Sequence, residues 1–216
     1  MPRRHTLAWL AGAALLLSGC GGASSSSQDP PPTPEPGAAA IRMAAVGDSI
    51  TDADSADFDG GEPGPQSWVS YAVGEDVEFV GGWAVWGAST AQMADEVEAL
   101  DADVLVILAG TNDAGTMAHQ EITANITAIA EQAGVQDVVL SAVPPIDAAP
   151  ASATELNESL ADLARAQDWT WVDTPAGLRA GEQFAEGMAD DGLHPNEAGA
   201  RVLGEEIGEA VRAAIW

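Results

Sequence analysis

Ser49 lies where an apolar run ends and a glycine-flanked turn begins, and it is the first candidate for covalent chemistry in this chain of 216 residues. Residues 41 to 46 are mostly apolar and stand between a Pro/Gly tract and Gly47, which predicts a buried central strand. A serine just past such a strand occupies the position where open α/β sheets place their ligands. Gly47-Asp48-Ser49 alone is also typical of an ordinary turn. Ser49 as a nucleophile therefore needs partners elsewhere in the chain.

A histidine is the usual base for such a serine, because a hydroxyl is a poor nucleophile until its proton is taken. The chain has three histidines. His5 falls in the expected signal peptide, and His119 begins an amphipathic helix, where capping or packing is the commoner role. Only His194 has a carboxylate placed locally to orient it, Asp191, which would fix its tautomer and stabilise the imidazolium. We therefore predict a Ser49, His194, Asp191 triad.

Acyl transfer also needs hydrogen-bond donors for the developing oxyanion, from loops at the carboxyl ends of neighbouring strands. Gly87 follows the second predicted strand and offers a backbone N–H; Asn112 follows the third and offers a side-chain amide. Each alone is equally typical of a turn.

Together these segments resemble the SGNH (GDSL-type) hydrolase family. The resemblance spans nearly the whole predicted domain and rests on Gly47-Asp48-Ser49-Ile50, Gly87, Gly110-Thr111-Asn112-Asp113 and Asp191-Gly192-Leu193-His194-Pro195. It implies Ser49 as nucleophile, His194 as base, Asp191 as its orienting acid, and an oxyanion hole of the Ser49 and Gly87 N–H groups and the Asn112 amide. It also implies an SGNH-hydrolase/flavodoxin-like fold. The Gly-x-Ser-x-Gly elbow of α/β-hydrolases is absent.

The segments around these residues alternate between strand and helix patterns. Such alternation predicts right-handed crossovers and a mainly parallel sheet in a three-layer α/β/α sandwich. Asn196 is the expected N-cap of the last helix. The expected strands are 41–46, 77–86, 104–108, 138–140 and 169–172; the expected helices are 67–73, 90–100, and segments around 122–129, 156–163 and 198–211.

Residues 1 to 19 have the pattern of a signal peptide, with Arg3 and Arg4 before an apolar run too short to span a bilayer comfortably. Leu17-Ser18-Gly19-Cys20 resembles a bacterial lipobox, which implies that Cys20 carries the lipid of a lipoprotein. A plain secretory signal with a spare cysteine is the alternative, and the arginine pair leaves twin-arginine export open.

Residues 20 to 40 are rich in serine and proline and predict a tether, with the hydrolase domain at 41 to 216. We thus expect an exported protein, lipid-anchored through Cys20 to the outer face of a bacterial membrane.

The composition is strongly acidic, with 34 Asp and Glu against seven Lys and Arg and a formal charge of −27. This balance argues against nucleic acid as a partner and against polyanionic substrates. We expect no metal or other cofactor, since the histidines and the single cysteine do not make a zinc set. The acidic segment 52–65 lacks the EF-hand register, so a solvated loop is favoured over a calcium site.

The substrate is less defined than the reaction. We expect a serine esterase acting on acyl or acetyl esters of a small molecule, glycan or lipid. An O-acyltransferase acting on a sugar and a non-catalytic glycan-binding module are the alternatives. Trp83 and Trp86 would form an aromatic wall for a sugar or acyl chain, or else pack in the core.

Overall fold

The computed structural model describes residues 39–215, and these form a five-stranded, fully parallel sheet with the strand order β2-β1-β3-β4-β5. The strands are β1 (Ile41–Gly47), β2 (Val77–Ala84), β3 (Val104–Leu108), β4 (Asp137–Ser141) and β5 (Thr170–Val172). All five residues of β3 are buried, as a continuous apolar run in a sheet covered on both faces requires.

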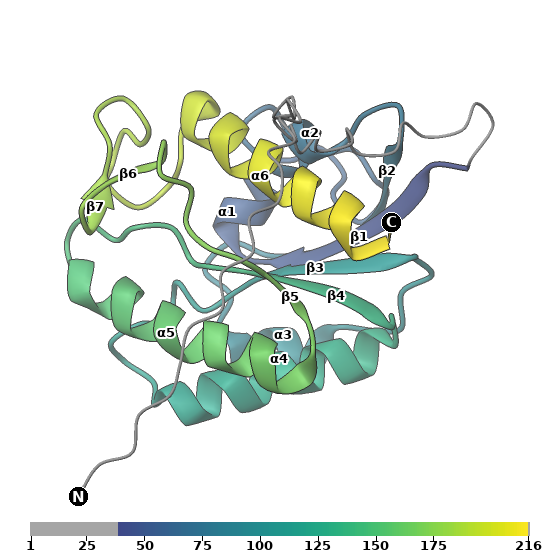
Figure 1. The fold of residues 1–216 in the computed structure, drawn as a ribbon, viewed down its shortest axis with the longest axis horizontal. Helices are drawn as coiled ribbons and strands as arrows, with labels where there is room; N and C mark the ends of the chain where they lie inside the picture. Colours follow the sequence, from purple (N-terminus) through teal and green to yellow (C-terminus); the bar gives the residue numbers. More distant parts are fainter. Residues whose placement is uncertain (1–38, 216) are drawn as a thin grey trace, which may run out of the picture. The chain divides into compact units, whose positions relative to one another are not determined.

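Helices cover both faces of the sheet, so the predicted three-layer α/β/α architecture is confirmed (Figure 1). In Figure 1, α2 and α6 lie above the sheet, and α3, α4 and α5 lie below it. The helices are α1 (Ser49–Asp52), α2 (Val69–Ala72), α3 (Thr90–Glu96), α4 (His119–Ala133), α5 (Pro150–Gln167) and α6 (Glu197–Ile215).

Two hydrophobic cores follow from the alternation of side chains along each strand. On one face, Met43 and Val106 pack with Leu203 and Ile207 of α6. On the other, strand residues such as Ile107 pack with the stripes of α3, α4 and α5, in a cluster that includes Met93, Ile122, Ile126, Leu156 and Leu160. The sheet is therefore held rigid from both sides.

The strand order places a topological switch between β1 and β3, because the chain leaves β1 toward β2 on one side and later returns to β3 on the other. Ligands of open α/β sheets bind outside the carboxyl ends of the strands at such a switch. Ser49 follows β1, and Asn112 follows β3. The fold thus brings both predicted site residues to the same place.

Three local features differ from the sequence prediction. The predicted helix 90–100 ends at Glu96, because Val97 is extended and the N–H of Leu100 donates to Ala133 O at the end of α4. The short helix α1 directly after β1 was not predicted. Neither was the antiparallel pair β6 (Arg179–Ala180) and β7 (Gln183–Phe184).

The signal peptide 1–19, Cys20 and most of the tether lie outside the described residues, so they and the domain boundaries stay predictions. Within 39–215, none of the helices is both long and apolar enough to cross a membrane.

Candidate active site

The nucleophile candidate sits at the first residue of α1. Asp48 is the N-cap of this helix, and its Oδ1 accepts a hydrogen bond of 3.0 Å from the N–H of Ile50. This cap turns the chain sharply as it leaves β1, since the side-chain oxygen satisfies an N–H that the helix itself cannot. Ser49 is only 7% exposed and is fixed by the end of a buried strand.

Ser49, His194 and Asp191 form one hydrogen-bonded chain. Ser49 Oγ lies 3.0 Å from His194 Nε2, and His194 Nδ1 lies 2.7 Å from Asp191 Oδ2. Ser49 and His194 are 145 residues apart in the sequence, and the fold brings them into contact. The arrangement is that of a nucleophile, its base and the group that orients the base.

The loop that carries His194 is held from both ends. Asn196 caps α6, with its Oδ1 accepting from the N–H groups of Ala198 and Gly199, so the predicted N-cap is confirmed. The same side chain donates to Gly187 O across the loop. His194 therefore projects from a braced turn at the start of α6.

Two backbone N–H groups hold the Asp191 carboxylate in position. Its Oδ1 accepts from the N–H groups of Leu193 and His194 at 2.9 and 2.8 Å, while Oδ2 faces the imidazole. The hydrogen bond with the His194 side chain, helped by these N–H groups, lowers the pKa of Asp191 to about 2. Asp191 is therefore ionised at neutral pH and keeps the Nδ1 proton of His194 on its own side.

Asn112 reaches the same site from the loop after β3. Its Nδ2 donates to Ala88 O at 3.0 Å and more weakly to Asp48 Oδ2 at 3.4 Å. Next to it, the buried Asp113 accepts from the N–H of Thr90 at 2.8 Å. Both residues thus link the loop after β3 to the segment that begins α3.

Gly87 has a left-handed backbone conformation and lies in an open position. Its φ is +73°, and a Cβ built on it would meet no atom within 4 Å, so the position faces open space. Among the described residues, the N–H groups of Ser49 and Gly87 donate to no protein acceptor. These two N–H groups remain available for a ligand oxygen, and the role of Gly87 stays a prediction.

Asp48 is a feature of the site that the sequence analysis did not single out. It is fully buried next to Ser49, and this burial raises its pKa to about 6, although the N–H of Ile50 and the nearby His194 oppose the shift. In the sequence, Gly47-Asp48-Ser49 is typical of a turn, and a turn motif does not indicate burial. The burial of Asp48 therefore could not be predicted from the sequence.

The two tryptophans that were considered as an aromatic wall have different places. Trp83 lies on β2 and packs, partly buried, against the core that faces α3 and α4. Trp86 is 51% exposed, and its ring centroid lies 5.2 Å from that of His194 with 31° between the planes. Its Nε1 donates to Asp52 Oδ2 at 2.6 Å. Trp86 alone therefore borders the site.

His119 lies away from this group. It is the first residue of α4, and its Nδ1 lies 3.0 Å from Ser159 Oγ on α5. No carboxylate contacts this imidazole among the described residues. The pair connects two helices and lacks the orienting acid of the His194 group.

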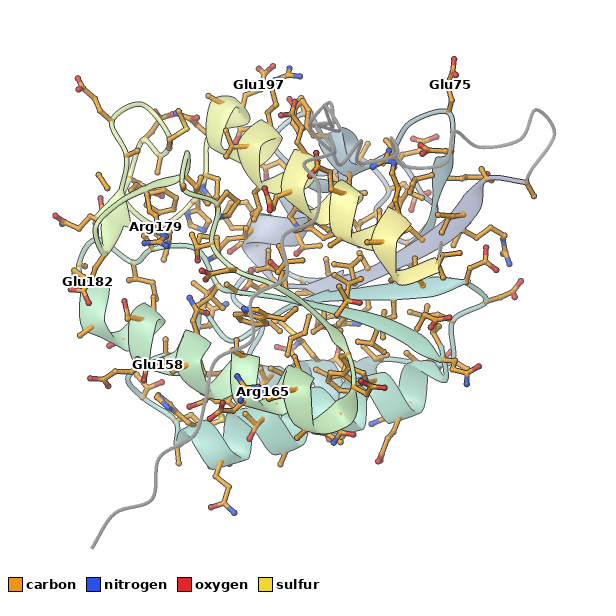
Figure 2. All side chains as sticks on the ribbon, viewed as in Figure 1. Glu75, Glu158, Arg165, Arg179, Glu182 and Glu197 are labelled. Atoms are coloured by element: carbon orange, nitrogen blue, oxygen red, sulfur yellow. The ribbon has the colours of Figure 1, made fainter. Side chains whose placement is uncertain are left out.

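No group of three or more His, Cys, Asp or Glu side chains within 39–215 is arranged to hold a metal ion. A surface recess of about 530 Å³ is lined by other residues than those around Ser49. It is open to solvent and lies among α5, the end of β5 and the β6–β7 pair, with Trp171, Asp173 and the residues Glu158, Arg179 and Glu182 labelled in Figure 2 around it.

A rigid parallel sheet with a serine, histidine and aspartate chain at its switch point has the arrangement of a serine-dependent hydrolase. The profile of the GDSL-like Lipase/Acylhydrolase family matches residues 45–202, and the chain belongs to this family. No protein with a curated function is similar enough to count as a match.

Solved structures of the same fold align with most of the chain. A Bacteroides fragilis protein is 21% identical, with 85% of this chain and 92% of that one covered and a TM-score of 0.65. A lipase/acylhydrolase from Enterococcus faecalis is 19% identical over 80% and 96% of the two chains, with a TM-score of 0.61. A carbohydrate esterase family 3 structure from Talaromyces cellulolyticus is 21% identical over 81% and 98%, with a TM-score of 0.58. At these identities the similarity establishes the fold.

Proposed function

We propose that this protein hydrolyses carboxylic esters through a covalent acyl-enzyme on Ser49. The observation that carries the proposal is the chain of short contacts from Ser49 Oγ to His194 Nε2 and from His194 Nδ1 to Asp191. Family membership supports the same reaction class.

In the first step, Ser49 Oγ attacks the ester carbonyl carbon while His194 Nε2 takes its proton. The bond from carbon to the alcohol oxygen then breaks, and His194 returns the proton to that oxygen. In the second step, water loses a proton to His194 and attacks the acyl-enzyme, which releases the acid and restores Ser49. Ionised Asp191 stabilises the imidazolium in both steps.

The carbonyl oxygen becomes negative in each step and needs donors. The free N–H groups of Ser49 and Gly87 and the amide of Asn112 are the proposed donors. Asn112 would exchange its long 3.4 Å contact with Asp48 for the oxyanion and keep the shorter one to Ala88 O.

Water is favoured over a sugar as the final acceptor because the site is open. The His194 side chain is 30% exposed, so solvent reaches the base directly. An O-acyltransferase generally excludes water from its acyl-enzyme to avoid losing the acyl group. The similarity to a protein named carbohydrate esterase also supports hydrolysis.

The test is hydrolysis of p-nitrophenyl acetate, butyrate and octanoate by the purified full-length chain and by Ser49→Ala and His194→Ala. Both changes are expected to abolish turnover while the circular dichroism of the fold persists. The matched controls are Ser159→Ala and His119→Ala, which remove the second serine and histidine pair and should leave turnover intact. Equal activity in the wild type and Ser49→Ala would refute the proposal.

Export and lipid attachment are a separate proposal, based on the N-terminal sequence alone. We propose cleavage before Cys20 and acylation of that residue, which would hold the acidic domain at a membrane that repels it. Labelled palmitate should appear on the wild-type protein and be absent from Cys20→Ala; label on both would contradict it.

A further inference from the structure

Trp86 is an apolar side chain that the fold leaves in solvent at the site. Within 39–215, the large hydrophobic residues that are exposed are Val85, at 39%, and Trp86, at 51%. They are neighbours, and they directly precede Gly87. An exposed aromatic ring of this size beside reactive groups is typical of a binding surface.

The indole is also fixed in position. Its Nε1 donates to Asp52 Oδ2 at 2.6 Å, and Asp52 belongs to α1, the helix that starts at Ser49. On its other side the ring lies 5.2 Å from His194, centroid to centroid. Trp86 is therefore a rigid surface beside the imidazole, held by the same helix that positions the nucleophile.

The chemistry of the proposed hydrolysis decides which half of the ester lies near this ring. His194 must return its proton to the alcohol oxygen, so that oxygen has to come within hydrogen-bond reach of Nε2. The carbonyl oxygen lies instead toward the N–H groups and the Asn112 amide. The part of the substrate that departs with the alcohol oxygen is thus the part next to the imidazole and next to Trp86.

The charges of the domain restrict the kind of alcohol. Each of the five arginines in 39–215 has a carboxylate within 4.0 Å, and none of these pairs includes Trp86 or a residue of the Ser49 site. Arg165 and Arg179, both labelled in Figure 2, are two of these. Around Trp86 the charged neighbour is the acceptor Asp52, and the formal charge of the chain is −27. An anionic alcohol would be repelled.

The exposed apolar area restricts the kind of alcohol further. A long alkyl alcohol needs a continuous apolar surface, and here that surface consists of Val85 and the face of Trp86. A neutral ring with hydroxyl groups on its edge fits both features, because its C–H face packs on the indole while a carboxylate accepts hydrogen bonds from its hydroxyls.

We propose that Trp86, held by Asp52, is the binding platform for the alcohol half of the ester, and that this alcohol is a neutral sugar ring. The inference rests on the proposed ester hydrolysis. Trp86 is a specificity-determining residue, and its removal should affect esters of sugars and spare esters of small acyclic alcohols.

The test compares xylose tetraacetate with ethyl acetate, which carry the same acetyl group on a ring and on an acyclic alcohol. In Trp86→Leu, kcat/KM for the sugar ester should fall on the order of tenfold, which corresponds to about 1.4 kcal/mol, mainly through KM. With ethyl acetate it should stay within about twofold of the wild type. Trp86→Phe, which keeps an aromatic ring and loses the Asp52 contact, should fall between the two.

Trp171→Leu is the matched control, because this tryptophan lines the recess that is formed by other residues than those around Ser49. An equal loss on both esters in Trp86→Leu would mean that Trp86 only supports the imidazole, and would overturn the inference. So would a loss that grows along ethyl acetate, butyrate and octanoate, since the ring would then bind the acyl half.

A binding measurement separates this inference from the proposed function. Methyl xyloside is titrated into Ser49→Ala and into Ser49→Ala with Trp86→Leu, and observed by NMR. Binding that requires Trp86 supports the platform even if no ester is turned over, whereas binding that does not depend on Trp86 counts against it. Failure of Ser49-dependent hydrolysis in the wild type overturns the proposed function and the assignment of the sugar to the alcohol half of an ester, whereas sugar binding that requires Trp86 is decided by the titration alone.

Discussion

Replacing Asp191 by Asn tests the triad by reversing one hydrogen bond. The two backbone N–H groups of Leu193 and His194 both point at Oδ1, at 2.9 and 2.8 Å. In Asp191→Asn the amide oxygen is expected to keep these two bonds, which turns its NH2 group toward His194 Nδ1. The imidazole must then carry its proton on Nε2, where it faces Ser49 Oγ as a donor and can no longer accept the serine proton.

The size of the effect follows from the cost of restoring the reactive tautomer. The Asn side chain would have to rotate by half a turn, give up two backbone hydrogen bonds and point its NH2 group at two N–H donors. Two lost bonds and the unsatisfied donors cost about 2–6 kcal/mol. The Asp191 side chain is 56% exposed, so water satisfies part of this, and about 4 kcal/mol is our central value. At 1.36 kcal/mol per tenfold, kcat should fall about 10³-fold.

The assay is kcat on p-nitrophenyl acetate at saturating substrate, with KM expected to change little. Asp190→Asn is the charge-matched control, since Asp190 is the preceding residue and accepts a hydrogen bond from Asn196 instead of contacting the imidazole. A buried protease triad loses about 10⁴ in kcat on the same exchange. If Asp191→Asn stays within about tenfold of the wild type, Asp191 does not set the tautomer and the reasoning fails.

Three further changes probe the same end of the sheet. Asn112→Ala should lower kcat by about 10²–10³ on p-nitrophenyl acetate, and a loss below about tenfold would remove Asn112 from the oxyanion site. Gly47→Ala should lower the free energy of unfolding, measured in urea, by about 1–3 kcal/mol, because the new Cβ would collide with Thr51 Oγ1 and lie 2.8 Å from Leu108 O. The control is Gly177→Ala, which should change the free energy of unfolding little because its Cβ would come no nearer than 3.4 Å to another side chain. For Asp48, whose pKa is raised from 3.8 to about 6, the native state holds more protons between these values, so its stability falls as pH rises through that window. Asp48→Asn should remove this decline, so the stability of the variant relative to the wild type should improve by roughly 3 kcal/mol between pH 3 and pH 7. Urea unfolding of both proteins at the two pH values measures this, and a stability difference that does not change with pH would contradict the raised pKa.

The sequence predicted the sheet well because its strands are short apolar runs buried on both faces. Val104 to Leu108 is recognisable without any tertiary information, and the Asn196 cap is a local signal as well. The end of α3 was predicted wrongly for the opposite reason. Leu100 fits the helical stripe, but the chain leaves the helix at Val97 to pair Leu100 with the end of α4, a contact that no local pattern contains.

The candidate site likewise contains residues that the sequence could predict and residues whose position only the fold determines. Ser49, Asp191 and His194 were found from motifs, since each residue type is required by the chemistry, and the fold then brings them into contact. Trp83 and Trp86 could not be told apart in the sequence, because the predicted strand 77–86 contains both and the surroundings of each depend on where the strand ends. β2 ends at Ala84, so Trp83 packs against the core and Trp86 reaches the site.

The burial of Asp48 shows where this fold gives up stability for the geometry of the site. A carboxyl with its pKa raised to about 6 costs roughly 3 kcal/mol at neutral pH, a large fraction of the net stability of a domain. Two of its contacts concern the site: Oδ1 caps the helix that begins with Ser49, and Oδ2 accepts from the amide of Asn112. An alanine would avoid the cost of burying the charge, but it would leave α1 without a cap and Asn112 with one acceptor fewer. The unfavourable charge therefore lies where one side chain contacts both the segment after β1 and the loop after β3, directly beside Ser49.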